Sequence, residues 1–281
     1  MLILLKDVTH IYNQDSPVEA LKEINLEISR GDFIGLIGPT GSGKSTLVQL
    51  LNGLITPSSG RVLVEGRDIT KDKQQLKKIR QQVGLVFQYP EHQLFEETIF
   101  KEIAFGPRNM GLDEQEVEQR VTEVLKLVDM PVDEFGDRSP FNLSGGQQRK
   151  IAIAGILAMA PQLLILDEPF AGLDPEGRRQ LSLLLKQLHR EQKLTLILIS
   201  HRMEEVALLA NRVLVLNEGK LVLEGSPREI FSQPERLRKL SLSIPQVTEV
   251  LQELKKKGLG VRTDIFEIKE AAGEIMESLR S

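Results

Sequence analysis

Eight consecutive residues near the start of this 281-residue chain have the pattern of a loop that binds phosphate. They follow the short apolar run 33–37, precede a helix-like stretch that continues to residue 54, and read Gly38, Pro39, Thr40, Gly41, Ser42, Gly43, Lys44 and Ser45. Glycines between a strand and a helix let backbone N–H groups converge on phosphate oxygens at the helix N-terminus. Lys44 adds positive charge toward the β- and γ-phosphates, and the Ser45 hydroxyl can bind Mg²⁺. The strand–loop–helix context disfavours the alternative, a glycine-rich turn without a ligand.

Two acidic residues end a second apolar run. Asp167 and Glu168 directly follow Leu164, Ile165 and Leu166. Carboxylates are costly inside an apolar strand, so we expect them at the carboxyl edge of the sheet, where open α/β sheets bind ligands. Asp167 suits a direct or water-mediated contact with Mg²⁺, and Glu168 is placed to polarise a water molecule against the γ-phosphate. Two acids can simply end a strand, but beside a phosphate loop they predict nucleotide hydrolysis.

A second glycine-lined helix start lies between these two motifs. Its residues are Leu143, Ser144, Gly145, Gly146 and Gln147, and a helix-like stretch follows over 150–159. Such a helix end can also receive an anion. Ser144 could act only as an N-cap, but that interpretation leaves the paired glycines unexplained. The sequence therefore predicts two helix ends that face phosphate.

The phosphate loop, the Leu143–Gln147 signature and the Asp167–Glu168 pair, in that order, resemble the ATP-binding cassette (ABC) ATPase family over roughly residues 1–230. The resemblance implies an ATPase that uses ATP and Mg²⁺. Mg²⁺ would be bound by Ser45, Gln88 and Asp167. Glu168, His201 and Gln88 would form the catalytic set.

The same resemblance assigns roles to residues outside the three motifs. Tyr12 would stack on adenine, as its flat amphipathic ring allows, and the less favoured alternative is a strand tyrosine that packs on the sheet. Thr46 would bind ATP beside the phosphate loop. Asp174, in the run Gly172-Leu173-Asp174, would belong to the D-loop. His201 would face the γ-phosphate, whereas most histidines that follow a strand are simply surface residues.

In this family the signature of one subunit completes the ATP site on the phosphate loop of another. The resemblance thus implies a head-to-tail pair of ATPase subunits with two shared sites. The sequence supports this independently, because one chain has one phosphate loop and one signature, each half of a phosphate clamp.

The segment after Gln88 narrows the resemblance. Residues 89–98 (YPEHQLFEET) and 103–109 (IAFGPRN) are similar to the ATPases of energy-coupling-factor (ECF) transporters, the cobalt and vitamin importers, and in particular to the second of two ATPase isoforms. That implies a transmembrane coupling subunit, a substrate-binding membrane subunit and a peripheral location on the cytoplasmic face of the cell membrane. We hypothesise that residues 89–110 form the groove for the transmembrane partner's coupling helices. An ordinary helix and loop is the alternative.

The distribution of apolar residues predicts an α/β fold of the phosphate-loop NTPase type. Buried runs separated by charged helical stretches predict a mainly parallel sheet with helices on both faces, and residues 2–30 with 62–64 predict a small antiparallel layer. We expect a cassette over 1–232, with a helical insert at about 89–160, and an appendage over 233–281. An apolar stripe in the appendage either packs on its own core or meets another subunit: Ile244, Val247, Val250, Leu251 and Leu254.

Composition excludes several classes of protein. A net charge of −4 gives no basic field for holding nucleic acid, and the absence of cysteine excludes a disulfide framework and fits a reducing compartment. The longest apolar stretch, 151–160, is too short to span a membrane. The remaining alternatives are another class of ABC transporter, a soluble ABC protein in repair or translation, and a phosphate-loop kinase. The last would leave the signature without a role.

Overall fold

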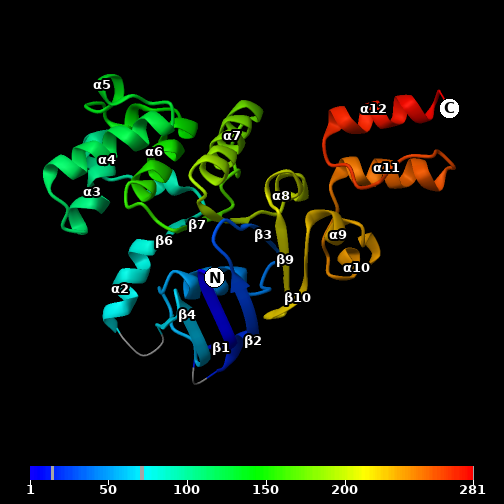
Figure 1. The fold of residues 1–281 in the computed structure, drawn as a ribbon, viewed down its shortest axis with the longest axis horizontal. Helices are drawn as coiled ribbons and strands as arrows, with labels where there is room; N and C mark the ends of the chain where they lie inside the picture. Colours follow the sequence, from blue (N-terminus) through cyan, green and yellow to red (C-terminus); the bar gives the residue numbers. More distant parts are fainter. Residues whose placement is uncertain (14–15, 70–72, 281) are drawn as a thin grey trace.

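The computed structural model describes residues 1–13, 16–69 and 73–280, in which two sheets are stacked and helices cover the large one (Figure 1). The large sheet has the order β10-β9-β3-β8-β7-β6 and is parallel except for the β9–β10 hairpin. Its strands are β3 (Phe33–Ile37), β6 (Val83–Val86), β7 (Leu163–Asp167), β8 (Thr195–Ile199), β9 (Arg212–Asn217) and β10 (Lys220–Gly225). The predicted α/β fold with a mainly parallel core is confirmed.

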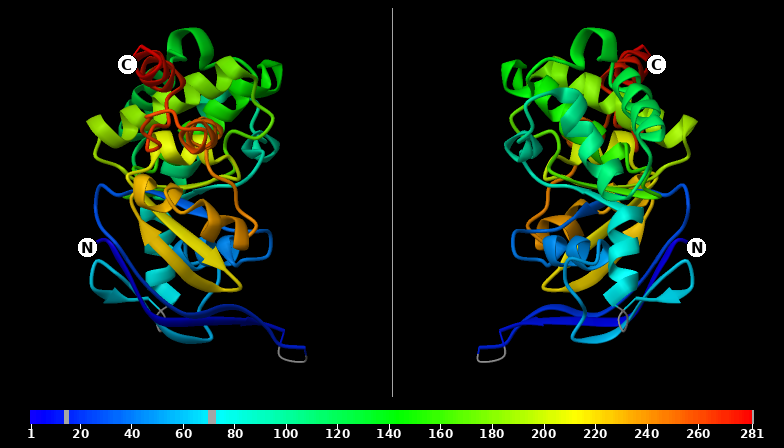
Figure 2. Two further views of the ribbon diagram at one scale, coloured as in Figure 1. Left: turned by 90° about the vertical axis from the view of Figure 1, so that its right-hand side faces the viewer. Right: turned by 90° about the vertical axis from the view of Figure 1, so that its left-hand side faces the viewer.

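The small sheet is antiparallel, also as predicted, with the order β2-β1-β4-β5. Its strands are β1 (Ile3–Tyr12), β2 (Val18–Ile28), β4 (Ser59–Val64) and β5 (Arg67–Asp68). Apolar side chains that alternate along β1 and β2 are buried against the large sheet and against α1 (Lys44–Leu51). Figure 2 shows this layer on the opposite side of the large sheet from most helices.

Successive side chains of each buried strand point to opposite faces of the sheet and pack in different cores, as strand geometry requires. In β7, Leu163 and Ile165 face the small sheet and α1, whereas Leu164 and Leu166 face the helical side. The helical side includes α7 (Pro175–Glu191) and the predicted insert, in which no strand occurs among the described residues of 89–160. The insert consists of η1 (Pro90–Gln93), α3 (Ile99–Asn109), α4 (Glu114–Leu127), α5 (Val132–Phe135), η2 (Pro140–Asn142) and α6 (Gly145–Leu157).

The C-terminal region has two parts. Helices α9 (Pro227–Phe231) and α10 (Pro234–Lys239) pack with β9 and with α8 (Met203–Leu209), so the chain just beyond residue 232 still shares a core with the large sheet. Helices α11 (Gln246–Lys256) and α12 (Ile268–Ser278) form a separate small core beside it (Figure 1). The boundary expected at 232/233 therefore stays a prediction.

The apolar stripe of the appendage divides between two environments. Ile244 is buried against the α8–α10 core, Leu251 is fully buried between α11 and α12, and Val247 and Leu254 pack beside it. Val250 is 54% exposed. Most of the stripe thus stabilises its own chain.

Strand register brings the carboxyl ends of four strands level with one another. Leu36 of β3 and Asp167 of β7 both pair with Ile199 of β8, and Val86 of β6 pairs with Leu166. The loops that follow these strands therefore start at one edge of the sheet. They contain the phosphate loop, Glu168, His201 and Gln88 respectively.

Close packing of α8 on β3 predicts an asymmetry between two glycine substitutions. A Cβ on Gly35 of β3 would lie 2.4 Å from Val206 Cγ1, whereas one on Gly273 of α12 meets nothing within 4 Å. We expect Gly35→Ala to lower the free energy of unfolding by about 1–3 kcal/mol through overpacking. Gly273→Ala should raise it by about 0.5–1 kcal/mol, since glycine weakens a helix. Urea unfolding measures both, and a Gly35→Ala variant as stable as the parent would contradict this packing.

Candidate active site

The phosphate loop connects β3 to α1, and at Gly43 its backbone adopts a conformation and a close packing that only glycine allows. Gly43 has φ 103°, and a Cβ there would lie 2.6 Å from the carbonyl oxygen of Ala20, so this position requires glycine. Because Gly43 is also the cap residue of α1, no side chain occupies the first N–H groups of that helix. The N-terminus of α1 is therefore open to an anion.

Lys44 and Ser42 complete this loop. Lys44 is 8% exposed, and its ammonium donates hydrogen bonds to the carbonyls of Gly38 and Pro39, at 2.7 and 2.9 Å. Burial lowers the Lys44 pKa, while the negative charges of Glu168 and Asp167 act to raise it. The Ser42 hydroxyl is buried without a hydrogen-bond partner in the described chain. Lys44 and Ser42 are among the residues 41–46 that line a pocket of about 260 Å³.

The two acids lie at the end of β7, as the sequence predicts. Burial raises the pKa of Asp167, and Lys44 and His201 counteract the effect. Burial, followed by the nearby carboxylates of Asp167 and Glu205, raises the pKa of Glu168 to about 7. Glu168 is therefore a base whose affinity for protons matches neutral pH.

His201 lies against Glu168. Its Nε2 is 3.4 Å from Glu168 Oε1, too far for a good hydrogen bond, and that buried oxygen accepts none from the described residues. Burial and the charge of Lys44 lower the His201 pKa, so the imidazole is neutral at pH 7. Glu168 Oε1 is consequently a free acceptor that a water molecule could use.

Tyr12 and Gln88 lie beside the group formed by Lys44, Glu168 and His201. The Tyr12 hydroxyl donates to Thr46 Oγ1 at 3.3 Å, and its ring is 39% exposed beside His10. Val18, the strand partner of Tyr12, lines the phosphate-loop pocket. Gln88 is an exposed residue just after β6, level with Glu168 by register.

The signature forms the start of α6, which begins at Gly145, five residues earlier than the helix-like stretch in the sequence suggests. Ser144 is its N-cap, and its side chain and that of Gln147 form a reciprocal capping box. A Cβ on Gly145 would meet nothing within 4 Å, so the paired glycines leave an open surface beyond the cap.

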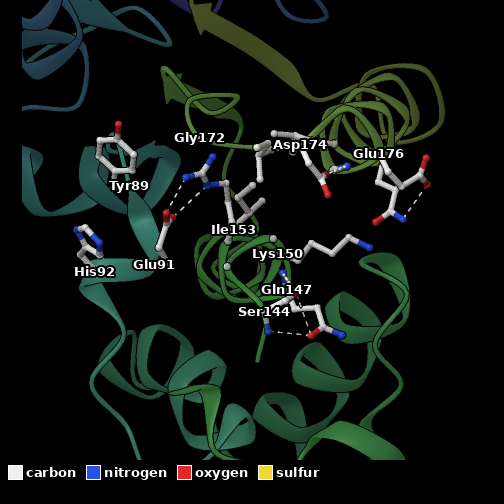
Figure 3. A pocket seen from close by; sticks show the side chains of 17 residues that line it. Tyr89, Glu91, His92, Ser144, Gln147, Lys150, Ile153, Gly172, Asp174 and Glu176 are labelled. Atoms are coloured by element: carbon white, nitrogen blue, oxygen red, sulfur yellow. Dashed lines mark hydrogen bonds and ion pairs between the residues drawn. The ribbon is translucent and has the colours of Figure 1, made fainter. Parts of the chain in front are cut away.

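Signature and D-loop line one pocket of about 660 Å³ (Figure 3). Asp174 is the N-cap of α7 and accepts a hydrogen bond from Gly177 N at 2.7 Å. The residues around this pocket include Ser144, Gln147 and Asp174 but none from the phosphate loop, and the phosphate-loop pocket includes none from the signature. One chain thus holds the two anion-binding ends in separate pockets.

Sequence reasoning missed Arg149 and Glu205. Arg149 is 3% exposed inside the insert. Glu205 is partly buried, accepts a hydrogen bond from Ser200 at 2.7 Å and helps to raise the Glu168 pKa. Their positions, two residues beyond the signature and four beyond His201, are the only signal in the sequence, because a charged helical residue is normally exposed.

Two properties of the described chain bear on metals and membranes. Within residues 1–13, 16–69 and 73–280, no three His, Cys, Asp or Glu side chains are grouped to hold a metal ion. Among the helices described, none is both long enough and apolar enough to cross a bilayer.

Comparison with known proteins gives consistent matches. The family model "ABC transporter" matches residues 21–171. A Caldanaerobacter subterraneus subsp. tengcongensis protein called energy-coupling factor transporter ATP-binding protein EcfA2 is 52% identical over 100% of this chain and 98% of its own. A protein of the same name from Clostridium tetani is 50% identical over 99% of this chain and 97% of its own.

Two solved structures extend the comparison. The cbiO1 protein of Clostridium perfringens, described as part of the ABC transporter complex cbiONQ, has a TM-score of 0.76 at 37% identity, covering 89% of this chain and 98% of that one. The cassette MJ0796, described as a dimer in a post-hydrolysis state with ADP and Pi, has a TM-score of 0.71 at 30% identity, covering 80% of this chain and 99% of that one.

The raised Glu168 pKa predicts how that residue affects stability without nucleotide or Mg²⁺. The ordinary glutamate pKa is 4.5 and the folded value is about 7, so between these values the folded chain holds a proton that the unfolded chain has lost. Stability therefore falls as pH rises from about 4.5 to about 7, and the loss is complete above pH 7. We expect Glu168→Gln to gain roughly 2 kcal/mol at pH 8, and the gain to vanish below about pH 5.

Thermal unfolding in EDTA across that pH range measures this effect, with the exposed Glu118→Gln as the matched control. A stability gain for Glu168→Gln that does not depend on pH would contradict the raised pKa.

Proposed function

The chain belongs to the ABC transporter family as an ATP-hydrolysing subunit of the energy-coupling-factor kind, and from this premise we propose that it powers uptake of a vitamin or transition-metal ion through separate membrane subunits. The observation that carries the proposal is that Lys44, Glu168 and His201 lie together at one edge of the sheet. The chain that holds them is similar over its full length to an ECF transporter ATP-binding protein.

ATP would bind at the phosphate loop. The open N-terminus of α1, the Lys44 ammonium and the unpaired Ser42 hydroxyl provide the donors that a triphosphate needs. Residues 38–46 would surround the phosphates, and the half-exposed ring of Tyr12 would stack on adenine. On this proposal, Lys44 exchanges its two carbonyl acceptors for phosphate oxygens when ATP enters.

The residues at this edge also fit Mg²⁺. Mg²⁺ usually takes only one or two protein carboxylates together with substrate phosphates and water, so a site without three clustered acids is suitable. Ser45, Asp167 and Gln88 would hold the ion, and the burial of Asp167 next to Lys44 supports its part. Bound there, Mg²⁺ would neutralise charge on the β- and γ-phosphates.

Hydrolysis would proceed by in-line attack of water on the γ-phosphorus. Glu168 Oε1 accepts the water proton as the new P–O bond forms, and the bond to the β-phosphate oxygen breaks to release ADP. His201, neutral at pH 7, would donate a hydrogen bond to a γ-phosphate oxygen. No intermediate covalently bound to the protein is needed.

The complete site would require a second ATPase subunit. The separate signature pocket supports this, because the capped start of α6 and the D-loop line a pocket that contains no residue of the chain's own phosphate loop. We propose that Ser144 and Gly145 of one protomer close over the ATP held at Lys44 of the other, with Asp174 between the sites. The exposed Val250, Ile268 and Met276 of α11 and α12 would add to that dimer.

A surface groove is suited to the transmembrane partner. It has a volume of about 380 Å³ and is lined by η1, α3, α6 and the end of α2 (Lys73–Gln82), with Gln93, Phe105 and Met159 among its residues. Phe95 is 57% exposed and packs edge-to-face on Phe105, with ring centres 4.9 Å apart. Exposed aromatic rings next to an apolar groove suit a partner helix. The chain would thereby be held peripherally on the cytoplasmic face of the cell membrane.

The first test replaces the proposed base. Glu168→Gln should leave ATP affinity unchanged, lower the hydrolysis rate by about 10²–10⁴-fold and accumulate an ATP-bound dimer, because the carboxylate that takes the water proton is gone. Phosphate release, nucleotide binding and size-exclusion chromatography measure the three effects. Glu118→Gln is the control, and normal turnover by Glu168→Gln would disprove the assignment.

The second test addresses the groove. Leu94 is only 7% exposed and belongs to the core, so the informative variant is Phe95→Asp combined with Gln93→Ala. We expect this variant to lose co-purification with the membrane subunits from detergent extracts and to keep its ATPase activity. Leu183→Asp, 53% exposed on α7, is the matched control. Unchanged recovery of the membrane subunits with Phe95→Asp would remove the groove from the proposal and favour a soluble ABC function.

A further inference from the structure

A single guanidinium in the insert connects its own helix, α6, to two other segments of the site. Arg149 lies on α6, and its Nε and NH2 groups donate to the two carboxylate oxygens of Glu91, at 3.0 and 2.7 Å. Its NH1 group donates to the carbonyls of Pro169 and Ala171, at 2.9 and 2.6 Å. Figure 3 shows Glu91 on the same side of the pocket as Tyr89 and His92, and dashed lines from its carboxylate mark its two hydrogen bonds with Arg149.

The pair is buried, so its two charges depend on each other. The side chains of Arg149 and Glu91 are 4% and 13% exposed. Burial acts to raise the Glu91 pKa, but the hydrogen bonds and charge of Arg149 outweigh it and hold the pKa below its ordinary value. A buried ion whose partner moves away loses its compensation, so neither side chain can shift alone.

The three connected segments have different roles in the proposed function. Glu91 is in η1, which begins just after Gln88 and Tyr89 and lines the groove through Pro90 and Gln93. Arg149 is one helical turn from Gly145. The Ala171 carbonyl lies in the loop between Glu168 and Asp174.

We infer that Arg149 is a positioning residue that fastens η1 to the signature helix and to the D-loop, so that closure of the signature over ATP and displacement of the groove are one motion. The inference deepens the proposed function and rests on it for the meaning of the groove. Its chemical basis is the planar fork of arginine, which satisfies a carboxylate bidentately and still has NH1 for two carbonyls. A lysine ammonium cannot reach all three partners in this geometry.

The test reports directly on η1. Because the chain has no cysteine, Gln93→Cys provides a single attachment point for an environment-sensitive fluorophore in the groove. In the Glu168→Gln background, ATP with Mg²⁺ should change its emission as the ATPase pair closes. Arg149→Lys should abolish that change while the Kd for ATP stays within about threefold, because Arg149 touches nothing in the phosphate-loop pocket.

Two further variants separate linkage from folding. Glu91→Gln combined with Arg149→Met removes both buried charges, so it should fold and still lose the emission change. Arg138→Lys, whose exposed ion pair with Glu134 spans 3.2 Å in the same insert, should keep it. The inference is overturned if the ATP-dependent emission change survives in a folded Arg149→Lys or double variant. It is also overturned if the protein that keeps Arg149 shows no ATP-dependent emission change. Neither result bears on the groove itself, which co-purification of Phe95→Asp decides.

Discussion

The shared register of β6, β7, β8 and β3 is the constraint on which the rest of the molecule depends. Parallel strands with aligned carboxyl ends start their loops at one level, so a lysine, two carboxylates and an imidazole from distant parts of the sequence meet at one edge. The helices and the small antiparallel sheet bury the strands on both faces and fix that alignment. The pairing of the strand backbones therefore determines which side chains lie together at the site.

Burial determines the electrostatics at that edge. Partial desolvation raises the pKa values of Asp167 and Glu168 and lowers that of Lys44, so the groups are poised to exchange protons and charge with an entering ligand. The signature helix, in contrast, presents uncharged N–H groups behind a Ser144 cap and lies in a different pocket. Each chain provides its own catalytic base, Glu168, but only half of the groups that bind one triphosphate. We therefore expect catalysis to require pairing of two subunits.

Much of this arrangement was predictable from the sequence, because the strands that hold the site are continuous apolar runs of ordinary length. The apolar runs that form β3 and β7, the mainly parallel sheet, the antiparallel layer and the helical insert were all predicted. The four-residue β6 was missed because it contains Gly84, where a Cβ would lie 2.4 Å from Ile156, so its placement depends on tertiary packing. Edge strand β10 and helices α2 and α12 were missed as well. Burial of Arg149 could not be inferred, since its partners are 58, 20 and 22 residues away.

The central claim is that helix starts from opposite protomers bind the same triphosphate. The most direct measurement is an experimental structure of the Glu168→Gln protein with ATP and Mg²⁺ in its closed assembly. The account predicts that the Ser144 hydroxyl and Gly145 N–H of one protomer lie within hydrogen-bonding distance of the γ-phosphate held at Lys44 of the other. A closed assembly in which Ser144 contacts no nucleotide, or contacts only the ATP bound by its own chain, would contradict it.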